Sequence, residues 1–287
     1  MLREGKITTI CSNKRIVCQK KIISLESPLV MGILNLTQDS FYDGGKYTTL
    51  NRALNRVEEI IEQGGDIIDI GACSTRPGAK LTTAKEETER ILPVLKETRK
   101  IFPECIISID TVWSDVCKAA KDNGADIIND ISGGSFDANL FKTVGELNMP
   151  YILMHTPTTP DKMQLNPHYD DIFMEISKYF YERLDLLLQA GVKDIILDPG
   201  YGFGKTIEDN YELLRRQKEF EIFNRPILTG ISRKSMIYKP LNITPDKALN
   251  GTAFLHAFAL ENGADILRVH DVAAAKECVN LYKLYKR

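Results

Sequence analysis

Polar side chains that could do chemistry follow short apolar runs all along this sequence. These candidates are Asn35, Asp69, Asp110, Asn129, His155, Asp198, Ser232, Lys234, Arg268 and His270. Carboxylates and amides gathered in one cavity need hydrogen-bond partners, and a flat heterocycle with N–H, NH2 and C=O groups supplies them. The basic members come late in the chain, which favours phosphate binding at one end of the cavity. We therefore expect a site for a flat heterocycle, with a phosphate-binding end.

Each candidate taken alone also has a structural explanation. An Asp or Ser just past a strand often caps the next helix. We interpret Asp69 as mainly structural, because a glycine and a turn follow it at once. His155 could equally well be a buried imidazole whose hydrogen bonds are satisfied. The functional hypothesis therefore depends on the whole set rather than on any one member.

A short sequence pattern that recurs along the chain, the repeated phrase, indicates which elements position these residues. A glycine, a short turn, an apolar run and a polar side chain recur at residues 64–69, 124–129, 191–198 and 263–268. This phrase is typical of the helix-to-strand half of a βα unit. The full series predicts strands at residues 29–36, 66–71, 105–110, 126–131, 150–155, 194–198, 226–232 and 265–270. Their continuous apolar character indicates parallel strands that are covered on both faces.

Amphipathic segments lie between the predicted strands. One helical stripe consists of Ile172, Ile176, Phe180, Leu184 and Leu187, which are spaced by three or four residues. Eight strands that alternate with helices over ~250 residues indicate an α/β fold of the (β/α)8 TIM-barrel type. An open, doubly wound sheet remains the alternative. In a barrel the active site lies at the carboxyl ends of the strands, where the polar candidates occur.

Length and composition agree with one enzyme-sized domain. The chain has 287 residues and a formal net charge of −2, without a basic stripe for nucleic acid. It lacks an apolar run long enough for a membrane span and a signal-peptide core, so we expect a cytoplasmic protein. The six cysteines lack metal-ligand spacing and are interpreted as free thiols. We expect an N-terminal β-hairpin within residues 1–28, with its turn at residues 12–14, that plugs or flanks the barrel bottom, and one barrel domain over residues 29–287.

Two segments near the end of the barrel invite a phosphate interpretation. Residues 232–235 follow the seventh strand, and Arg268 and His270 end the eighth, ahead of a helix that starts near Asp271. Barrels often bind phosphate at this place, against a helix N-terminus. The glycine-rich residues 200–206 resemble a nucleotide loop, but only three residues separate Gly200 from Gly204, which precedes Lys205 and Thr206, where a P-loop needs four. We therefore reject the ATPase and dehydrogenase interpretations.

The same segments carry a family resemblance. Residues 31–45, 74–79, 108–111, 129–130, 198–205, 230–235 and 268–271 resemble, in order, the motifs of dihydropteroate synthase. That family condenses 6-hydroxymethyl-7,8-dihydropterin pyrophosphate with p-aminobenzoate, and releases pyrophosphate and dihydropteroate for folate synthesis. It is the target of sulfonamides. The resemblance implies these two small-molecule substrates, Mg2+ as cofactor and a homodimer formed through helices near the C-terminus.

The resemblance also implies roles for individual residues. The pterin ring would be bound by Asp110, Asn129, Met154, Asp198 and Lys234. The pyrophosphate would be bound by Asn35, Arg268 and His270, and Mg2+ by Asn35 and Asp39. The p-aminobenzoate pocket would consist of Thr75, Arg76, Pro77, Phe203 and Ser232. Asp110, Lys234, Asp39 and Arg268 would be the catalytic residues, without a covalent nucleophile.

The sequence departs from the family pattern in three places. Gln38 stands where the family usually has proline, Cys73 replaces the usual acidic residue before Ser74, and residues 154–160 differ from the usual methionine-histidine-rich phrase. We expect the first two departures to alter affinity for p-aminobenzoate and its sulfonamide mimics. Two other functions remain as alternatives: a pterin-dependent methyltransferase that serves a corrinoid protein, and a catalytically silent pterin-binding paralogue.

Overall fold

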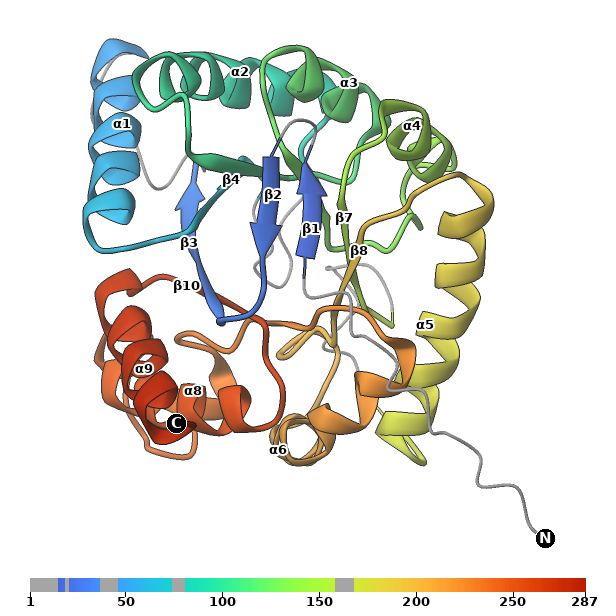
Figure 1. Cartoon of the computed structure of the whole chain (residues 1–287), viewed down its shortest axis with the longest axis vertical. Coiled ribbons are helices and arrows are strands. Elements are labelled where there is room, and N and C mark those ends of the chain that lie inside the picture. The colour runs from blue at the N-terminus through green and yellow to red at the C-terminus, as the bar shows by residue number, and fades with distance from the viewer. Residues whose placement is uncertain (1–14, 19–20, 37–45, 74–80, 158–167) are drawn as a thin grey trace, which may run out of the picture.

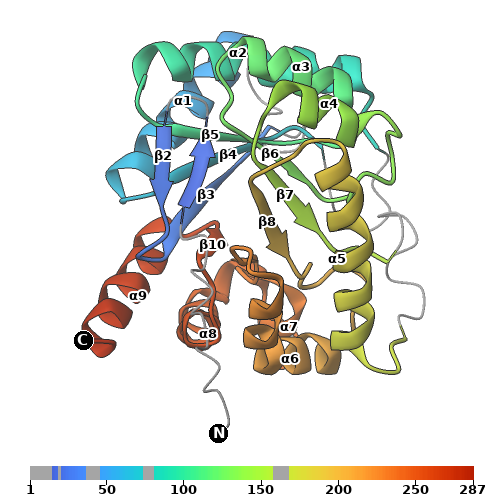
Figure 2. The same cartoon turned by 45° about the vertical axis from the view of Figure 1, so that its right-hand side comes forward.

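Parallel strands form a barrel that is surrounded by helices (Figures 1 and 2). The computed structural model describes residues 15–18, 21–36, 46–73, 81–157 and 168–287. The barrel strands in this part of the chain are β3 (Leu29–Asn35), β4 (Ile67–Gly71), β5 (Ile106–Asp110), β6 (Ile127–Asp130), β7 (Tyr151–Met154), β8 (Ile195–Asp198), β9 (Leu228–Thr229) and β10 (Ile266–Val269).

The strand order shows that the sheet closes on itself. Neighbouring strands follow the order β8-β7-β6-β5-β4-β3-β10-β9, and all these pairs inside the sheet are parallel. The remaining gap is bridged where the Leu197 N–H donates to the Pro226 carbonyl oxygen at 2.9 Å and Leu197 pairs with Ile227. The predicted barrel is therefore confirmed, and the open doubly wound sheet is wrong.

The seventh strand is much shorter than predicted. Residues 226–232 were expected to be one strand, but only Leu228–Thr229 pairs as β9. The chain leaves the sheet because it turns after Gly230: the Lys234 N–H donates to the Ile231 carbonyl at 3.2 Å, and Arg233 takes a left-handed φ of 56°. This turn brings Ser232 and Lys234 to the mouth of the barrel.

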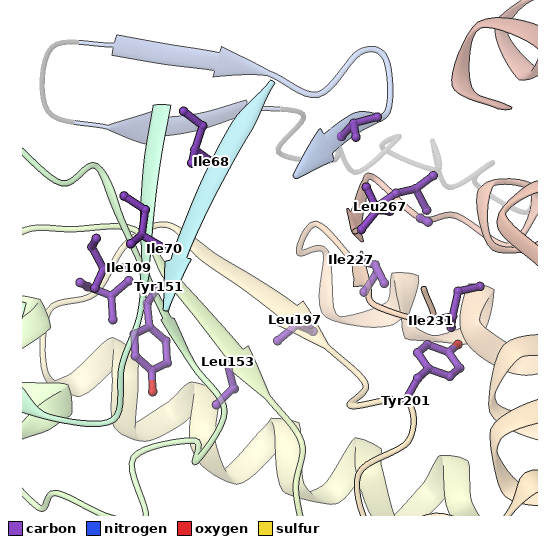
Figure 3. Close-up of a cluster of buried hydrophobic side chains, with 14 of the residues drawn as sticks. Ile68, Ile70, Ile109, Tyr151, Leu153, Leu197, Tyr201, Ile227, Ile231 and Leu267 are labelled. Carbon is purple, nitrogen blue, oxygen red and sulfur yellow. The ribbon is translucent and has the colours of Figure 1, made fainter. Parts of the chain in front are cut away.

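Helices cover the outside of the strands. They are α1 (Lys46–Glu62), α2 (Ala84–Ile101), α3 (Ser114–Asp122), α4 (Leu140–Leu147), α5 (Ile172–Gln189), α6 (Ile207–Arg216), α7 (Ser235–Tyr238), α8 (Leu249–Glu261) and α9 (Val272–Tyr285), with short 3-10 segments at Gln217–Phe223 and Pro245–Lys247. The predicted stripe of α5 is confirmed, because all five of its residues are buried. Apolar side chains such as Ile70, Leu153 and Leu197 form the core between strands and helices (Figure 3).

An N-terminal β-hairpin closes the bottom of the barrel, as predicted. Its antiparallel strands are β1 (Arg15–Cys18) and β2 (Lys21–Ser24), which lie across the centre of the ring in Figure 1. Ile16 and Cys18 are buried in a cluster with the first residues of the barrel strands, among them Met31 and Ile67. The predicted turn at residues 12–14 lies outside the described residues. The pairing of Cys18 with Lys21 places the connection between these two residues instead.

The hairpin provides the first testable prediction. Ile16→Ala should lower the free energy of unfolding by about 2–5 kcal/mol, because it leaves a cavity in the apolar cluster. The matched control is Val17→Ala on the opposite face of the same strand, where the side chain is 41% exposed. Urea unfolding curves should show a much larger loss for Ile16→Ala. Equal losses for the two variants would contradict a packing role for the hairpin.

Candidate functional site

The carboxyl ends of the strands bring the predicted polar residues to one mouth of the barrel. Asp110 ends β5, Asn129 lies in β6, Asp198 ends β8 and Arg268 lies in β10. Asp110, Asn129 and Asp198 are buried, with exposed fractions of 8%, 3% and 6%. Parallel strands force this convergence, since all their carboxyl ends meet at the same rim. The site therefore consists of charged groups that are largely removed from water.

Arg268 lies at the centre of this cluster. Its Nε donates to Asp69 Oδ2 at 2.7 Å, and its Nη2 lies 2.6 Å from the same oxygen. The same Nη2 donates to Asp110 Oδ2 at 2.8 Å. One guanidinium therefore joins two carboxylates that come from neighbouring strands.

Asp69 is a site residue that the sequence analysis interpreted as structural. Its side chain is fully buried, and its Oδ2 also accepts a hydrogen bond from Asn129 Nδ2 at 3.2 Å. The structural interpretation assumed that the following turn uses the Asp69 carboxylate. The carboxylate instead contacts Asn129 and Arg268. A signal was present in the sequence, because Asp69 ends the same repeated phrase that ends in Asn129, Asp198 and Arg268.

Burial shifts the proton affinities of these groups. It raises the pKa of Asp110 to about 7, against the opposing effect of the Arg268 charge, and Asp69 adds to the rise. Burial also raises the pKa of Asp198, while Lys234 lowers it. Burial lowers the pKa of Lys234 to about 8, against the opposing effect of Asp198. Each charge in the mouth therefore depends on a partner of opposite sign.

Lys234 reaches the site from the turn after β9. Its Nζ donates to the Tyr201 carbonyl oxygen and lies 4.6 Å from the centroid of the Phe203 ring. Phe203 in turn packs at the edge of a small apolar cluster that contains the buried Met154. The mouth thus has one apolar wall next to its charged groups, as a flat aromatic ligand requires.

Ser232 and His270 lie side by side at the rim. The His270 N–H donates to Ser232 Oγ at 3.2 Å, and His270 Nδ1 lies 3.3 Å from the same oxygen. Asn35 is exposed at the end of β3. Among the remaining predicted site residues, Asp39, Thr75, Arg76 and Pro77 lie outside the described residues.

His155 takes the structural role that was one of its two interpretations. Its ring is buried, and its Nδ1 lies 3.0 Å from Nζ of the buried Lys205. The same Nζ donates to the carbonyl oxygens of Gly200 at 2.8 Å and Phe203 at 3.1 Å. Lys205 therefore ties together the loop that carries Phe203, and burial lowers its pKa to about 7.

The part of the chain that the structure describes contains neither a cluster of metal ligands nor a helix that could span a membrane. Within it, no three or more His, Cys, Asp or Glu side chains gather as ligands for a metal ion. None of its helices combines the length and the apolar character needed to cross a membrane.

Comparisons with known proteins find relatives that match most of this chain. The family of pterin binding enzymes matches residues 31–270. Dihydropteroate synthase of Escherichia coli is 41% identical over 269 residues, which cover 93% of this chain and 95% of that protein. The chain belongs to the dihydropteroate synthase family.

Solved structures of the family have the same fold. A Yersinia pestis dihydropteroate synthase in complex with a sulfonamide drug is 35% identical, with a TM-score of 0.89 and coverage of 95% of this chain and 99% of that one. A Xanthomonas albilineans dihydropteroate synthase with 4-aminobenzoic acid is also 35% identical, with a TM-score of 0.89 and coverage of 95% and 98%. The barrel and its N-terminal hairpin thus belong to a family architecture.

One departure from the pattern of dihydropteroate synthases is visible near the mouth. Cys73, at the position where the family usually carries an acidic residue, is half-buried just after β4. Burial raises the pKa of its thiol, so the group is neutral at pH 7.

The ion pairs of Arg268 generate a second prediction. Arg268→Met should lower the free energy of unfolding by about 3–5 kcal/mol at pH 8, because two buried carboxylates lose their cation. Folding already raises the pKa of Asp110, and loss of Arg268 raises it further. A carboxyl whose pKa is raised by folding favours the folded state at low pH and opposes it as pH rises through that pKa. Urea unfolding should therefore show a smaller loss at pH 5 than at pH 8. Equal losses at the two pH values would contradict the buried pairing.

Proposed function

We propose that the chain condenses 6-hydroxymethyl-7,8-dihydropterin pyrophosphate with p-aminobenzoate to give 7,8-dihydropteroate and pyrophosphate. The observation that carries this proposal is the cluster at the mouth of the barrel, in which the buried Asp110, Asn129 and Asp198 lie with the half-buried Lys234 and Arg268. Membership of the dihydropteroate synthase family supports it. So do the solved relatives, since one contains 4-aminobenzoic acid and another was crystallised in the presence of pteroic acid.

The pterin ring is assigned to the deep part of the mouth. Asp110 and Asp198 each offer a carboxylate that can accept two adjacent N–H groups of a pteridine. Asn129 and Lys234 supply donors for ring nitrogen and oxygen atoms. Met154, which is 2% exposed, provides an apolar contact for the ring face. This assignment gives Asp110, Asn129, Asp198 and Lys234 each a hydrogen-bond partner on the substrate.

The pyrophosphate is assigned to the rim formed by Arg268, His270 and Asn35. Arg268 can bind two phosphate oxygens at once, and the N-terminus of α9 just beyond His270 adds a favourable dipole. The p-aminobenzoate pocket is assigned to Phe203 and Ser232, together with Thr75, Arg76 and Pro77. Phe203 and Ser232 lie on the loops after β8 and β9, and the Phe203 ring lies 4.6 Å from Lys234 Nζ.

Magnesium is assigned to Asn35 and Asp39. Both side chains offer hard oxygen ligands, and Mg2+ commonly uses one or two protein oxygens together with substrate phosphates. A site of this kind needs no cluster of three protein ligands, so the donor chemistry fits. When bound, the ion would neutralise charge on the leaving pyrophosphate.

The mechanism follows from these assignments. The C–O bond between the pterin methylene and pyrophosphate breaks first, and the electron pair leaves with the pyrophosphate. Arg268 stabilises the charge that develops there, while the Asp110 carboxylate stabilises the pterin-methyl cation. The amine of p-aminobenzoate then attacks the methylene carbon and loses a proton to water. No side chain is needed as a covalent nucleophile.

We also propose a cytoplasmic protein. Cys18, Cys73, Cys105, Cys117 and Cys278 form no disulfide in the described part of the chain, which supports a reducing compartment.

A third prediction tests the proposed reaction directly. Purified protein with dihydropterin pyrophosphate, labelled p-aminobenzoate and Mg2+ should form labelled dihydropteroate, and a chelator should abolish this. Asp110→Asn should lower kcat by about 100-fold or more, since it removes a charge that stabilises the transition state. The unfolding midpoint of the Asp110→Asn variant should stay close to that of the wild-type protein. Pterin binding without product would favour the silent paralogue or the methyltransferase, and a folded Asp110→Asn variant with normal turnover would refute the role of Asp110.

We propose that the chain forms a homodimer, and a fourth prediction tests this. Phe254 and Phe258 on α8 and Leu281, Leu284 and Tyr285 on α9 are exposed, and these two helices pack together. Such an apolar surface is typical of an interface between subunits. Phe258→Glu should convert a dimer into monomers in sedimentation velocity. The control is Tyr181→Glu on α5, where another aromatic side chain is 72% exposed, and it should leave the dimer intact. A wild-type monomer would contradict the proposal.

A further inference from the structure

Asp69 has no part in the chemistry proposed above, yet it contacts two residues to which that chemistry assigns roles, Arg268 and Asn129. Its Oδ2 accepts hydrogen bonds from Arg268 and from Asn129 Nδ2. Its Oδ1 is buried and finds no hydrogen-bond donor among the described residues. A buried carboxylate with this arrangement is costly unless it holds a cation in place.

Arg268 occupies a carboxylate that the substrate needs. Its Nη2 lies 2.8 Å from Asp110 Oδ2, which the proposed function assigns to the pterin ring. The pterin N–H groups and the guanidinium compete for this one carboxylate. For the substrate to bind as proposed, Arg268 must therefore give up Asp110.

Asp69 can hold Arg268 while this happens. In the sheet register Asp69 lies opposite Ser108, two residues deeper in the barrel than Asp110, which lies opposite Gly71. It contacts Nε as well as Nη2, whereas Asp110 contacts only Nη2. The inner edge of the guanidinium is thus fixed on Asp69, and the outer part can change partners.

We propose that Asp69 is a positioning residue that retains Arg268 while the guanidinium exchanges Asp110 for the pyrophosphate of the substrate. This inference rests on the proposed function. The pyrophosphate withdraws Nη2 from Asp110 and so frees that carboxylate for the pterin ring. Asn129, which also contacts Asp69, is oriented toward the same ring. Binding of the two halves of the substrate is thereby coupled through one side chain.

The coupling can be measured on the wild-type protein. Because linkage is reciprocal, inorganic pyrophosphate should strengthen the binding of 6-hydroxymethylpterin, and the pterin should strengthen the binding of pyrophosphate by the same factor. We expect a factor of about five or more in titration calorimetry, with Mg2+ present throughout. Independent binding of the two ligands would overturn the inference.

The variant Asp69→Asn tests the part played by Asp69. It keeps the shape of the side chain but removes its charge, so Arg268 should remain on Asp110. We expect KM for dihydropterin pyrophosphate to rise by about tenfold or more, and the coupling between pyrophosphate and pterin to vanish. KM for p-aminobenzoate should stay within about twofold, since Asp69 does not touch that pocket.

The matched control is Asp126→Asn at the other end of the barrel. Asp126 Oδ2 lies 2.6 Å from Arg99 Nη2, so the same substitution breaks a comparable pair away from the mouth. It should lower thermal stability and leave both KM values and the coupling unchanged. An Asp69→Asn variant with the same pattern as this control would overturn the inference. If Asp69→Asn does not fold, the wild-type coupling alone decides.

Different results would contradict the proposed function and the proposed role of Asp69. A wild-type protein that forms no dihydropteroate contradicts the proposed function, and the inference falls with it. A wild-type protein that forms product while pyrophosphate and pterin bind independently contradicts only the proposed exchange of partners by Arg268 and the role of Asp69 in it.

Discussion

The ion pair between Arg268 and its two carboxylates is the interaction on which the mouth of the barrel depends. Asp69, Asp110 and Asp198 lie close together in a region that excludes most water, and their mutual repulsion must be offset. Arg268 offsets it from the last barrel strand, which pairs directly with β3 and lies next but one to β4. The charge balance thus depends on the direct pairing of β10 with β3, which brings the last barrel strand beside the first.

The closed barrel also keeps the residues that stabilise the fold at its bottom apart from the residues of the site at its mouth. The bottom is filled by an apolar cluster that the β1–β2 hairpin covers, and its buried Asp126 is satisfied by Arg99 and the Ile107 N–H. The mouth keeps charged groups whose partners can be exchanged for a ligand. A buried ion pair stabilises a fold only weakly compared with apolar packing, so the bottom must supply the stability that the mouth does not. The hairpin contributes to this by excluding water from the cluster around Met31 and Ile67.

The sequence predicted the strands well because each is a local apolar run with a clear boundary. The prediction of a strand end failed where residues outside the apolar run determine that end. Residues 230–232 have the composition of a strand, but the turn that ends in Lys234 takes them out of the sheet. The contact between Asp69 and Arg268 was missed for a related reason: the two residues lie 199 positions apart, and the local turn offered a simpler explanation for Asp69. The other mouth residues could be named because family motifs mark them, whereas their pairing is a property of the closed barrel alone.

The loop after β8 shows how similar residue types can serve opposite purposes. Gly200 and Gly202 have φ values of 70° and 78°, and a Cβ on Gly200 would lie 1.9 Å from the His155 carbonyl oxygen. In a P-loop, glycines turn backbone N–H groups toward phosphate. Here they turn carbonyl oxygens toward lysines: the Gly200 carbonyl accepts from Lys205, and the Tyr201 carbonyl accepts from Lys234. The loop therefore binds two cations near Asp198 instead of an anion, although its glycines resemble those of a phosphate loop.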